Sequence, residues 1–247
     1  MRFEEVAAGL GNFEYRPLTS RAVGRLLYEL ALEPGAEEVL ELGFAHGTST
    51  AYLAAALEEK GSGHLTTIDR PMALERHPNV EEVLEQLGLR PWVTPLVASS
   101  YDWVLMRLLE QSSRDEEIQP YVDLCFIDGA HSWETDGFAF LLVDRLLQAG
   151  GWIVFDDISW TFETSPSLRD SPEIAAMPEE ERTEQQVRKV VDLLVRTTPG
   201  YEVRLLGNLA LAFKGPSDAP EFQRLPAIAS AFLREAARSP VVRAPKP

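Results

Sequence analysis

Residues Asp123 to Thr161 read D-L-C-F-I-D-G-A-H-S-W-E-T-D-G-F-A-F-L-L-V-D-R-L-L-Q-A-G-G-W-I-V-F-D-D-I-S-W-T. The apolar runs Leu124–Ile127 and Trp152–Phe155 have the length and content of buried strands. Between them, apolar side chains recur at the spacing of a helix, namely Phe138, Leu141, Leu142, Leu146 and Leu147. We therefore predict a strand, a helix and a second strand, with the helix ending at Ala149-Gly150-Gly151.

Both predicted strands end in acidic residues. Asp128 follows the first strand, and Asp156 and Asp157 follow the second. The carboxyl ends of parallel strands meet at one edge of a sheet, where open α/β sheets bind ligands, so three carboxylates should converge there. A partly desolvated carboxylate needs a partner, hydrogen bonds or a metal ion. One aspartate alone would read equally well as a helix cap, but three of them with His131 favour a site.

The alternation of strand and helix extends toward the N-terminus. Strands are predicted at Val39–Leu42, Leu65–Ile68 and Trp92–Val97, and a helical pattern follows each of them. This order predicts an α/β fold in which a doubly wound, mostly parallel sheet carries helices on both faces. Near the C-terminus, Tyr201–Leu206 and Leu209–Phe213 are separated by two residues, which predicts an antiparallel hairpin.

Some segments do not follow this alternation of strands and helices. Residues 17–32 read as a helix and residues 111–120 as a charged loop. Residues 161–182 hold several prolines and acids with little apolar periodicity, which predicts either a lid or substrate-binding insertion or a surface excursion. We expect an N-terminal helical segment at 1–34, the main domain at 35–215 and a C-terminal extension at 216–247.

Composition restricts the classes of partner. The chain has 247 residues, is 45% hydrophobic and carries a formal net charge of −16. It can bury a full core, and its charge argues against nucleic acid and anionic membrane surfaces as partners. The single cysteine, Cys125, lies in a predicted strand and is expected in the core. With no signal or membrane-spanning pattern, a cytoplasmic location is the default expectation. The oligomeric state stays open, and a homo-oligomer is compatible with the sequence.

A nucleotide-like cofactor is suggested by two features. The segment E-L-G-F-A-H-G, from Glu41 to Gly47, follows a strand and precedes a helix, where glycine lets the backbone approach a ligand. It is neither a phosphate-binding P-loop nor a G-x-G-x-x-G dinucleotide motif. The second strand ends in Asp69, which is placed to accept hydrogen bonds from a ribose or to cap a helix.

Together these motifs resemble a class I S-adenosylmethionine-dependent methyltransferase. The residues that carry the resemblance are E-L-G-x-x-x-G, the acid that ends the second strand, F-I-D-G-A-H, and G-G-W-I-V-F-D-D. The closer likeness is to small-molecule O-methyltransferases of bacterial secondary metabolism, the branch that includes macrolide-sugar, coumarin and cephalosporin-biosynthesis relatives. It covers roughly residues 35 to 215. The resemblance implies a Rossmann-like, seven-stranded sheet whose last strand is antiparallel.

The resemblance also implies roles for individual residues. S-adenosylmethionine would be held at the positions Glu41, Gly43, Phe44, Gly47, Asp69, Ser99, Ser100 and Asp128. A divalent cation, usually magnesium, would be bound by Asp128, Asp156 and Asp157, and oxygen ligands suit such a hard cation. Ala130 stands where sugar-specific relatives can carry an acid, which argues against a sugar acceptor.

His131 and two tryptophans complete the predicted site. His131, with Asp128 beside it, is the available catalytic base, although it could also be only a first-turn residue bonded to a carboxylate. Trp133 and Trp160 flank the acidic edge and could wall a pocket for a small-molecule substrate. The sequence thus predicts metal-dependent O-methylation of a catechol or vicinal diol. The alternatives are a metal-independent N- or C-methyltransferase and a non-catalytic nucleotide-binding protein of the same fold.

Overall fold

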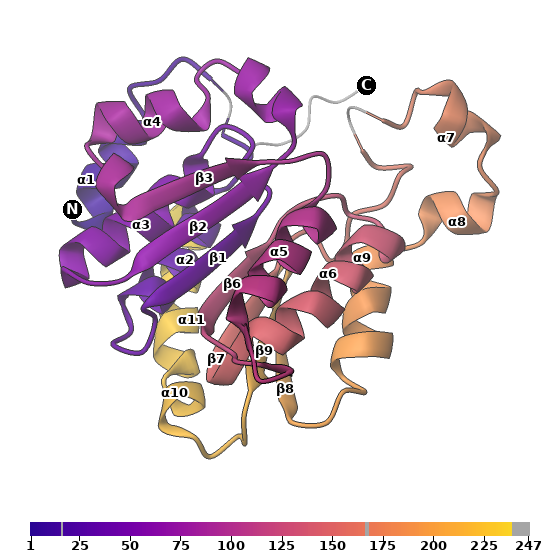
Figure 1. The fold of residues 1–247 in the computed structure, drawn as a ribbon. Coiled ribbons are helices and arrows are strands. Elements are labelled where there is room, and N and C mark those ends of the chain that lie inside the picture. Colours follow the sequence, from indigo (N-terminus) through magenta and orange to yellow (C-terminus); the bar gives the residue numbers. More distant parts are fainter. Residues whose placement is uncertain (16, 166–167, 239–247) are drawn as a thin grey trace.

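The computed structural model describes residues 1–15, 17–165 and 168–238. Its centre is a seven-stranded sheet with the order β3-β2-β1-β6-β7-β9-β8 (Figure 1). The strands, in chain order, are β1 Glu38–Leu42, β2 His64–Asp69, β3 Val93–Val97, β6 Val122–Ile127, β7 Leu147–Phe155, β8 Tyr201–Leu206 and β9 Leu209–Lys214. Strands β1, β2, β3, β6 and β7 pair in parallel, whereas β9 is antiparallel to both β7 and β8. The predicted doubly wound sheet with its C-terminal hairpin is confirmed.

Helices cover both faces of the sheet. One face carries α1 Phe3–Leu10, α2 Arg21–Leu32, α3 Thr48–Lys60, α4 Val80–Leu87 and α11 Leu225–Arg238. The other face carries α5 Tyr101–Ser112, α6 Trp133–Leu146 and α9 Gln186–Val190, which continues into the π-helical turn η3 Val191–Val195 (Figure 1). Short elements complete the fold: η1 Pro71–Glu75, η2 Arg90–Trp92, β4 Ser113–Arg114, β5 Glu117–Ile118, α7 Pro172–Ala176, α8 Glu179–Thr183 and α10 Pro220–Gln223.

The strands alternate between two cores. In β1, Val39 packs into the core under α2 and α3, whereas Leu40 and Leu42 pack into the core under α5 and α6. The same alternation places Cys125 in the second core, where its side chain is fully buried, as predicted. Successive side chains of a strand point to opposite faces, so a strand covered on both faces is apolar throughout.

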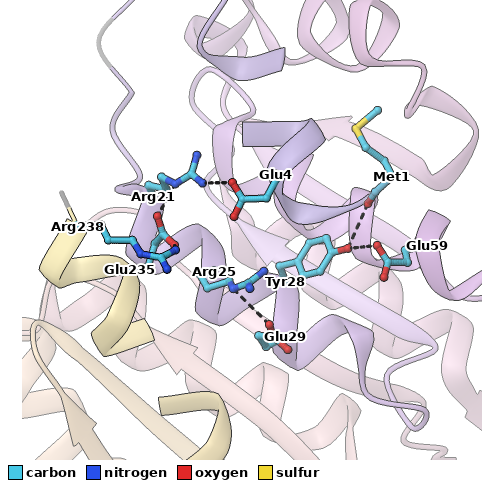
Figure 2. Close-up of polar contacts among 9 residues, drawn as sticks. All are labelled: Met1, Glu4, Arg21, Arg25, Tyr28, Glu29, Glu59, Glu235 and Arg238. Carbon is cyan, nitrogen blue, oxygen red and sulfur yellow. Dashed lines mark hydrogen bonds and ion pairs between the residues drawn. The ribbon is translucent and has the colours of Figure 1, made fainter. Parts of the chain in front are cut away.

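The two ends of the described chain meet on one face. The guanidinium of Arg21 in α2 bonds the carboxylates of Glu4 in α1 and Glu235 in α11 (Figure 2). Glu235 is buried, so this pair fixes α11 against α2 more firmly than a solvent-exposed ion pair would. Helices from the predicted N-terminal segment and C-terminal extension therefore share one core with the main sheet.

Several sequence-based boundaries were wrong. The helix predicted at 17–32 begins at Arg21, because the Ser20 hydroxyl accepts the Val23 N–H as its N-cap. The charged loop at 111–120 contains a small hairpin, β4–β5, whose two turn residues Asp115 and Glu116 both have positive φ. Residues 161–182 contain two short helices, while 166–167 and 239–247 lie outside the described residues.

The apolar residues that predicted the helix after Asp128 do not all face the sheet. Phe138 and Leu141 are each 50% exposed, and the side chains facing the sheet are Ala139, Phe140, Val143 and Leu146. The residues used for the prediction and the residues that are buried both recur at helical spacing, so periodicity alone could not identify the buried face of the helix. The helix also ends at Leu146, and Ala149-Gly150-Gly151 lies within β7 because Leu147 already pairs with Val122 of β6.

No helix in the described part of the chain is long and apolar enough to cross a lipid bilayer.

Candidate active site

The loops that follow β1, β6 and β7 lie side by side at one edge of the sheet. The Asp128 N–H donates to the Leu42 carbonyl oxygen at 2.9 Å, and the Asp156 N–H donates to the Ile127 carbonyl oxygen at 3.0 Å. On the other side, the Gly43 N–H donates to the Ile68 carbonyl oxygen at 2.8 Å. Strand order reverses between β1 and β6, which is where doubly wound sheets form their ligand crevice.

Gly43 allows the first of these loops to approach the second. Its φ is +98°, and a Cβ atom there would lie 2.0 Å from the carbonyl oxygen of Asp128. Gly47 also has a positive φ, of +89°, and forms the N-cap of α3. Side chains at these two positions would strain the backbone, and at Gly43 they would also push apart the two loops that form the site.

Glu41 lies beneath the glycine loop and is fully buried. Its Oε2 atom accepts hydrogen bonds from the hydroxyls of Thr50 at 2.6 Å and Thr67 at 2.5 Å, and Oε1 has no partner among the described residues. Burial raises the pKa of Glu41 to about 7, although hydrogen bonds from Ser49, Thr50 and Thr67 oppose this shift. The carboxyl group therefore contacts the start of α3 and strand β2 rather than an open surface.

Asp69 holds the glycine loop from the end of β2. Its Oδ2 atom accepts the N–H groups of Phe44 at 3.0 Å and Ala45 at 2.8 Å, and Oδ1 accepts the N–H of Arg70 at 2.7 Å. These bonds allow Ala45 to keep its positive φ of 46°. Ser99 and Ser100 follow β3 at the same edge, and Ser100 is the N-cap residue of α5 without a side-chain cap bond.

Three side chains form an acid cluster next to this loop: Asp128, His131 and Asp157. One donor atom from each lies within 4.8 Å of the others. His131 Nε2 is 3.2 Å from Asp128 Oδ1 and 3.5 Å from Asp157 Oδ2. Asp156, predicted as a ligand together with Asp128 and Asp157, does not join this cluster, and its Oδ1 atom accepts the Asp157 N–H at 2.7 Å. The structure thus brings His131 into the position in which the sequence placed a third aspartate.

The ionisable groups of the acid cluster shift one another's pKa values. Desolvation lowers the pKa of His131, but the hydrogen bond that its ring donates to Asp128 and the charges of Asp128, Asp157 and Asp136 raise it overall, to about 9. Burial raises the pKa of Asp157, and burial together with the charges of Asp128 and Asp157 raises that of Asp156 well above its usual value. The site therefore holds more negative charge than its own residues neutralise.

Two residues that the sequence analysis missed position the cluster. Asn208 Nδ2 donates to Asp157 Oδ1 at 2.6 Å, and Asn208 Oδ1 accepts the Ser159 N–H at 2.8 Å. Asp136, in the first turn of α6, is buried, and burial raises its pKa to about 6 although the charge of His131 and the nearby N–H groups of Ala130 and His131 oppose this shift. These contacts support the positive φ angles of Asp157, 53°, and His131, 56°.

One of these two residues could have been found from the sequence. Asn208 occupies the predicted hairpin turn, and its hairpin pairs with β7 so that Ala210 lies opposite Phe155. Adding that pairing to the prediction would place Asn208 near Asp157. Asp136 gave no such signal, because an aspartate in the first turn of a helix is common for local electrostatic reasons.

The two predicted substrate tryptophans lie in different surroundings. The Trp160 ring lies 5.2 Å from the His131 ring and 4.9 Å from the Phe162 ring, so it forms a wall of the acid cluster. Trp133, at the start of α6, instead lines a separate cavity with residues of the insertion. Tyr15 is a third aromatic neighbour of the cofactor loop: its hydroxyl is 2.6 Å from Thr48 Oγ1 and its ring 4.8 Å from His46.

Known proteins share this sequence pattern. A family described as "Methyltransferase domain" matches residues 40–158. A protein of Mycolicibacterium vanbaalenii named "Putative O-methyltransferase" is 30% identical over 180 residues, which cover 71% of either chain. A Mycobacterium sp. protein with the same name is 30% identical over 183 residues, covering 74% of this chain and 76% of the relative. The chain belongs to the class I S-adenosylmethionine-dependent O-methyltransferases.

Solved methyltransferase structures share the fold. TomG from Streptomyces achromogenes, an O-methyltransferase involved in tomaymycin synthesis and solved with S-adenosylmethionine, aligns with a TM-score of 0.57 at 21% identity. The alignment covers 87% of this chain and 89% of TomG. An O-methyltransferase from Bacillus cereus, solved with S-adenosylhomocysteine, gives 0.58 at 19% identity and covers 86% and 90%. At these identities the likeness confirms the architecture of this methyltransferase and not its acceptor.

In this methyltransferase, Asp69→Ala is expected to weaken binding of S-adenosylhomocysteine by about 10- to 100-fold, because charge-assisted hydrogen bonds are lost. It should also loosen the glycine loop, since the carboxylate accepts two of its N–H groups. Asp69→Asn is the comparison variant, because it keeps an oxygen acceptor for the loop but loses the charge. It should weaken cofactor binding with little loss of protein stability. Calorimetric titration and thermal unfolding measure the two effects. Wild-type affinity in both variants would exclude a cofactor role for Asp69.

Proposed function

We propose that this methyltransferase transfers the methyl group of S-adenosylmethionine to a hydroxyl of a small molecule that carries a neighbouring oxygen, such as a catechol or vicinal diol. The observation that carries the proposal is the acid cluster of Asp128, His131 and Asp157 next to the glycine loop. It combines a candidate base with two carboxylates at the edge where the cofactor loop ends. Methyl transfer needs mainly that donor and acceptor be held in line, which this juxtaposition favours.

For the cofactor, we assign the predicted residues to two kinds of role. The loop positions and strand ends that would contact S-adenosylmethionine are Gly43, Phe44, Gly47, Asp69, Ser99, Ser100 and Asp128. Glu41 would support the glycine loop rather than contact the cofactor, because its enclosed carboxyl group already bonds Thr50 and Thr67. This assignment is supported by the position of each residue at the carboxyl edge of the sheet, and by the role of Asp69 in holding the loop.

A divalent cation fits the acid cluster. Asp128 and Asp157 would hold it, and a bound cation would favour the charged form of Asp156 beside them. Oxygen donors suit magnesium or manganese. Bound there, the cation would lower the pKa of an acceptor hydroxyl. Asn208 keeps one oxygen of Asp157 occupied, which leaves the other oxygen for the site. A bound cation would offset the charge of the two carboxylates and so favour the neutral form of His131. His131 would then accept the proton of the hydroxyl at Nε2, and Trp160 would cover the face of the imidazole ring.

A metal-free reaction is the second candidate. It is favoured by one observation: His131 Nε2 already lies within 3.5 Å of both Asp128 and Asp157, so the imidazolium can serve as the cation of the cluster. In that case the carboxylates would orient His131 and the acceptor, which could then be a nitrogen or carbon nucleophile as well as an oxygen. The same residues are used, but chelation would have no effect.

The insertion at 161–182 would cover the acceptor. It starts directly after Trp160, and its helices α7 and α8 stand out from the edge where the parallel strands end (Figure 1). Its two ends are joined, since the Glu163 N–H donates to the Arg182 carbonyl oxygen at 3.1 Å and the two side chains form an ion pair. A loop with a fixed base and an extended tip suits a cover over a site. The motif resemblance in the sequence is what favours an acceptor from secondary metabolism.

The proposal is tested by methyl transfer from S-adenosylmethionine to 4-methylcatechol, to its monomethyl ether and to a primary amine. Each reaction is run with magnesium, with manganese and with a chelator. We expect transfer to the catechol alone, and at least a 10-fold loss with the chelator. Full activity with the chelator would favour the metal-free reaction. Absence of transfer to catechols and diols, in a protein that binds the cofactor, would contradict the proposed acceptor.

A further inference from the structure

A second recess lies beside the acid cluster, between α6, the insertion and α9. We refer to it as the insertion cavity. It has a volume of about 540 Å³, and its walls include Trp133, Leu193 and the carboxylates of Glu134, Glu180, Glu181 and Glu184. Trp133 is the first residue of α6 and follows His131 of the acid cluster by two positions, so the cavity and the cluster lie at the same end of α6.

The charge of the insertion cavity is not balanced. The one basic side chain that lines it, Lys189, has its Nζ atom 3.4 Å from Glu184 Oε2. Glu134, Glu180 and Glu181 form no ion pair with any residue that the structure describes. Carboxylates that line a concave, partly apolar wall produce a stronger local potential than the same charges on a convex surface. The cavity therefore attracts cations.

The insertion cavity also offers a ligand a hydrogen-bond donor and apolar contacts. Gln186 is 8% exposed, and its Oε1 atom accepts the Trp133 N–H at 2.9 Å. Within residues 1–15, 17–165 and 168–238, its Nε2 atom has no acceptor, although Gln186 lines the cavity. This donor is open to the cavity, where a ligand oxygen could accept it. The exposed faces of Trp133 and Leu193, 37% and 55% accessible, offer apolar contact.

From these contacts we propose that the insertion cavity binds an ammonium group attached to an apolar or aromatic body. The ring of Trp133 would lie against the cation, and the glutamates would neutralise it. The inference rests on the proposed function in one respect: because the cavity and the acid cluster lie at the same end of α6, we assign the ammonium group to the acceptor. The substrate class is thus an amine-bearing hydroxyl compound, and a carboxylate at the same place would be repelled.

Binding is tested first without any methyl acceptor. Phenethylammonium and 3-phenylpropionate have the same body and opposite charges, and both are titrated into the full-length protein by calorimetry. We expect phenethylammonium to bind with a Kd below about 1 mM and to weaken with added salt, and 3-phenylpropionate not to bind. The double variant Glu134→Gln/Glu181→Gln should weaken the amine by at least about 10-fold. Glu117→Gln, an exposed position in β5, is the matched control and should not change it.

Methyl transfer then separates this inference from the proposed function. The probes are 4-(aminomethyl)catechol, 4-methylcatechol and 3,4-dihydroxybenzoate, compared by kcat/KM in the wild type and in the double variant. We expect the amine to be preferred, and the preference to fall with the two glutamates. Equal use of all three catechols, or amine binding that is unchanged in the double variant, would overturn the inference and leave the function standing. Glutamate-dependent amine binding without transfer to any catechol would support the cavity as an amine site and contradict the proposed function.

Discussion

Asp128→Asn is expected to reduce methyl transfer by about 100- to 1,000-fold, the range typical for losing a positioned acid–base group. The side chain keeps its shape, and the backbone bond from Asp128 N–H to the Leu42 carbonyl stays, so the fold should persist. What is lost is the carboxylate that bonds His131 Nε2 at 3.2 Å and that contributes most to raising the pKa of His131. A candidate cation site also loses one of its two carboxylates.

Turnover with a catechol acceptor measures the loss of activity, and NMR titration of the imidazole should show a lowered pKa for His131 in the variant. Asp115→Asn is the matched control, because it removes the same charge at an exposed turn whose positive φ suits asparagine. Its activity should equal that of the wild type. Turnover of Asp128→Asn within about 3-fold of the wild type would mean that the acid cluster takes no part in the reaction.

Glu41→Gln is expected to make the protein more stable at alkaline pH. The folded-state pKa of Glu41 is raised to about 7 because its carboxyl group is fully buried. A raised carboxyl pKa means that the folded state binds the proton more tightly than the unfolded state does, so stability falls as pH rises from about 4.3 to 7. A pKa shift of this size lowers the free energy of unfolding by roughly 3 kcal/mol once the carboxyl group is ionised. An uncharged side chain at this position would not cause that loss.

Glutamine can still accept the hydroxyl hydrogen bonds of Thr50 and Thr67. Denaturant unfolding of both proteins from pH 4.5 to 8.5 measures the effect, and the difference in unfolding free energy should grow up to pH 7 and then stay constant. Any remaining loss above pH 6.5 comes from other groups with raised pKa values, among them Asp156 and His131. The raised pKa of His131 stabilises the folded state at lower pH and ceases to do so as pH passes about 9. A constant difference over the whole range would show that Glu41 has an ordinary pKa.

Measuring cofactor affinity in Glu41→Gln also decides between two roles of this residue. The motif resemblance placed Glu41 among the residues that hold S-adenosylmethionine, whereas the structure encloses its carboxyl group under the loop. Unchanged affinity for S-adenosylhomocysteine would favour the supporting role, and a loss comparable with that of Asp69→Ala would favour direct contact.

The sequence alone determined the order of strands and helices and the edge at which the acids lie. Runs such as Leu124–Ile127 are apolar because both faces of the strand are covered, and that pattern is local. The acids at 128, 156 and 157 and the glycine loop also lie directly after strands, so the parallel sheet brings them together. For the same reason the resemblance to methyltransferases could be stated from a few short motifs.

Tertiary structure decided what the sequence could not. Helical spacing fits two stripes on α6, and only packing against β6 and β7 selected the one containing Phe140 and Val143. The side chain grouped with Asp128 and Asp157 is that of His131, and the positive φ angles of His131 and Asp157 were not evident from the sequence. Asn208 and the insertion cavity join segments far apart in the chain. Strand and helix follow from local pattern, whereas the direction of a side chain in a site depends on the loops beside it, which no local pattern encodes.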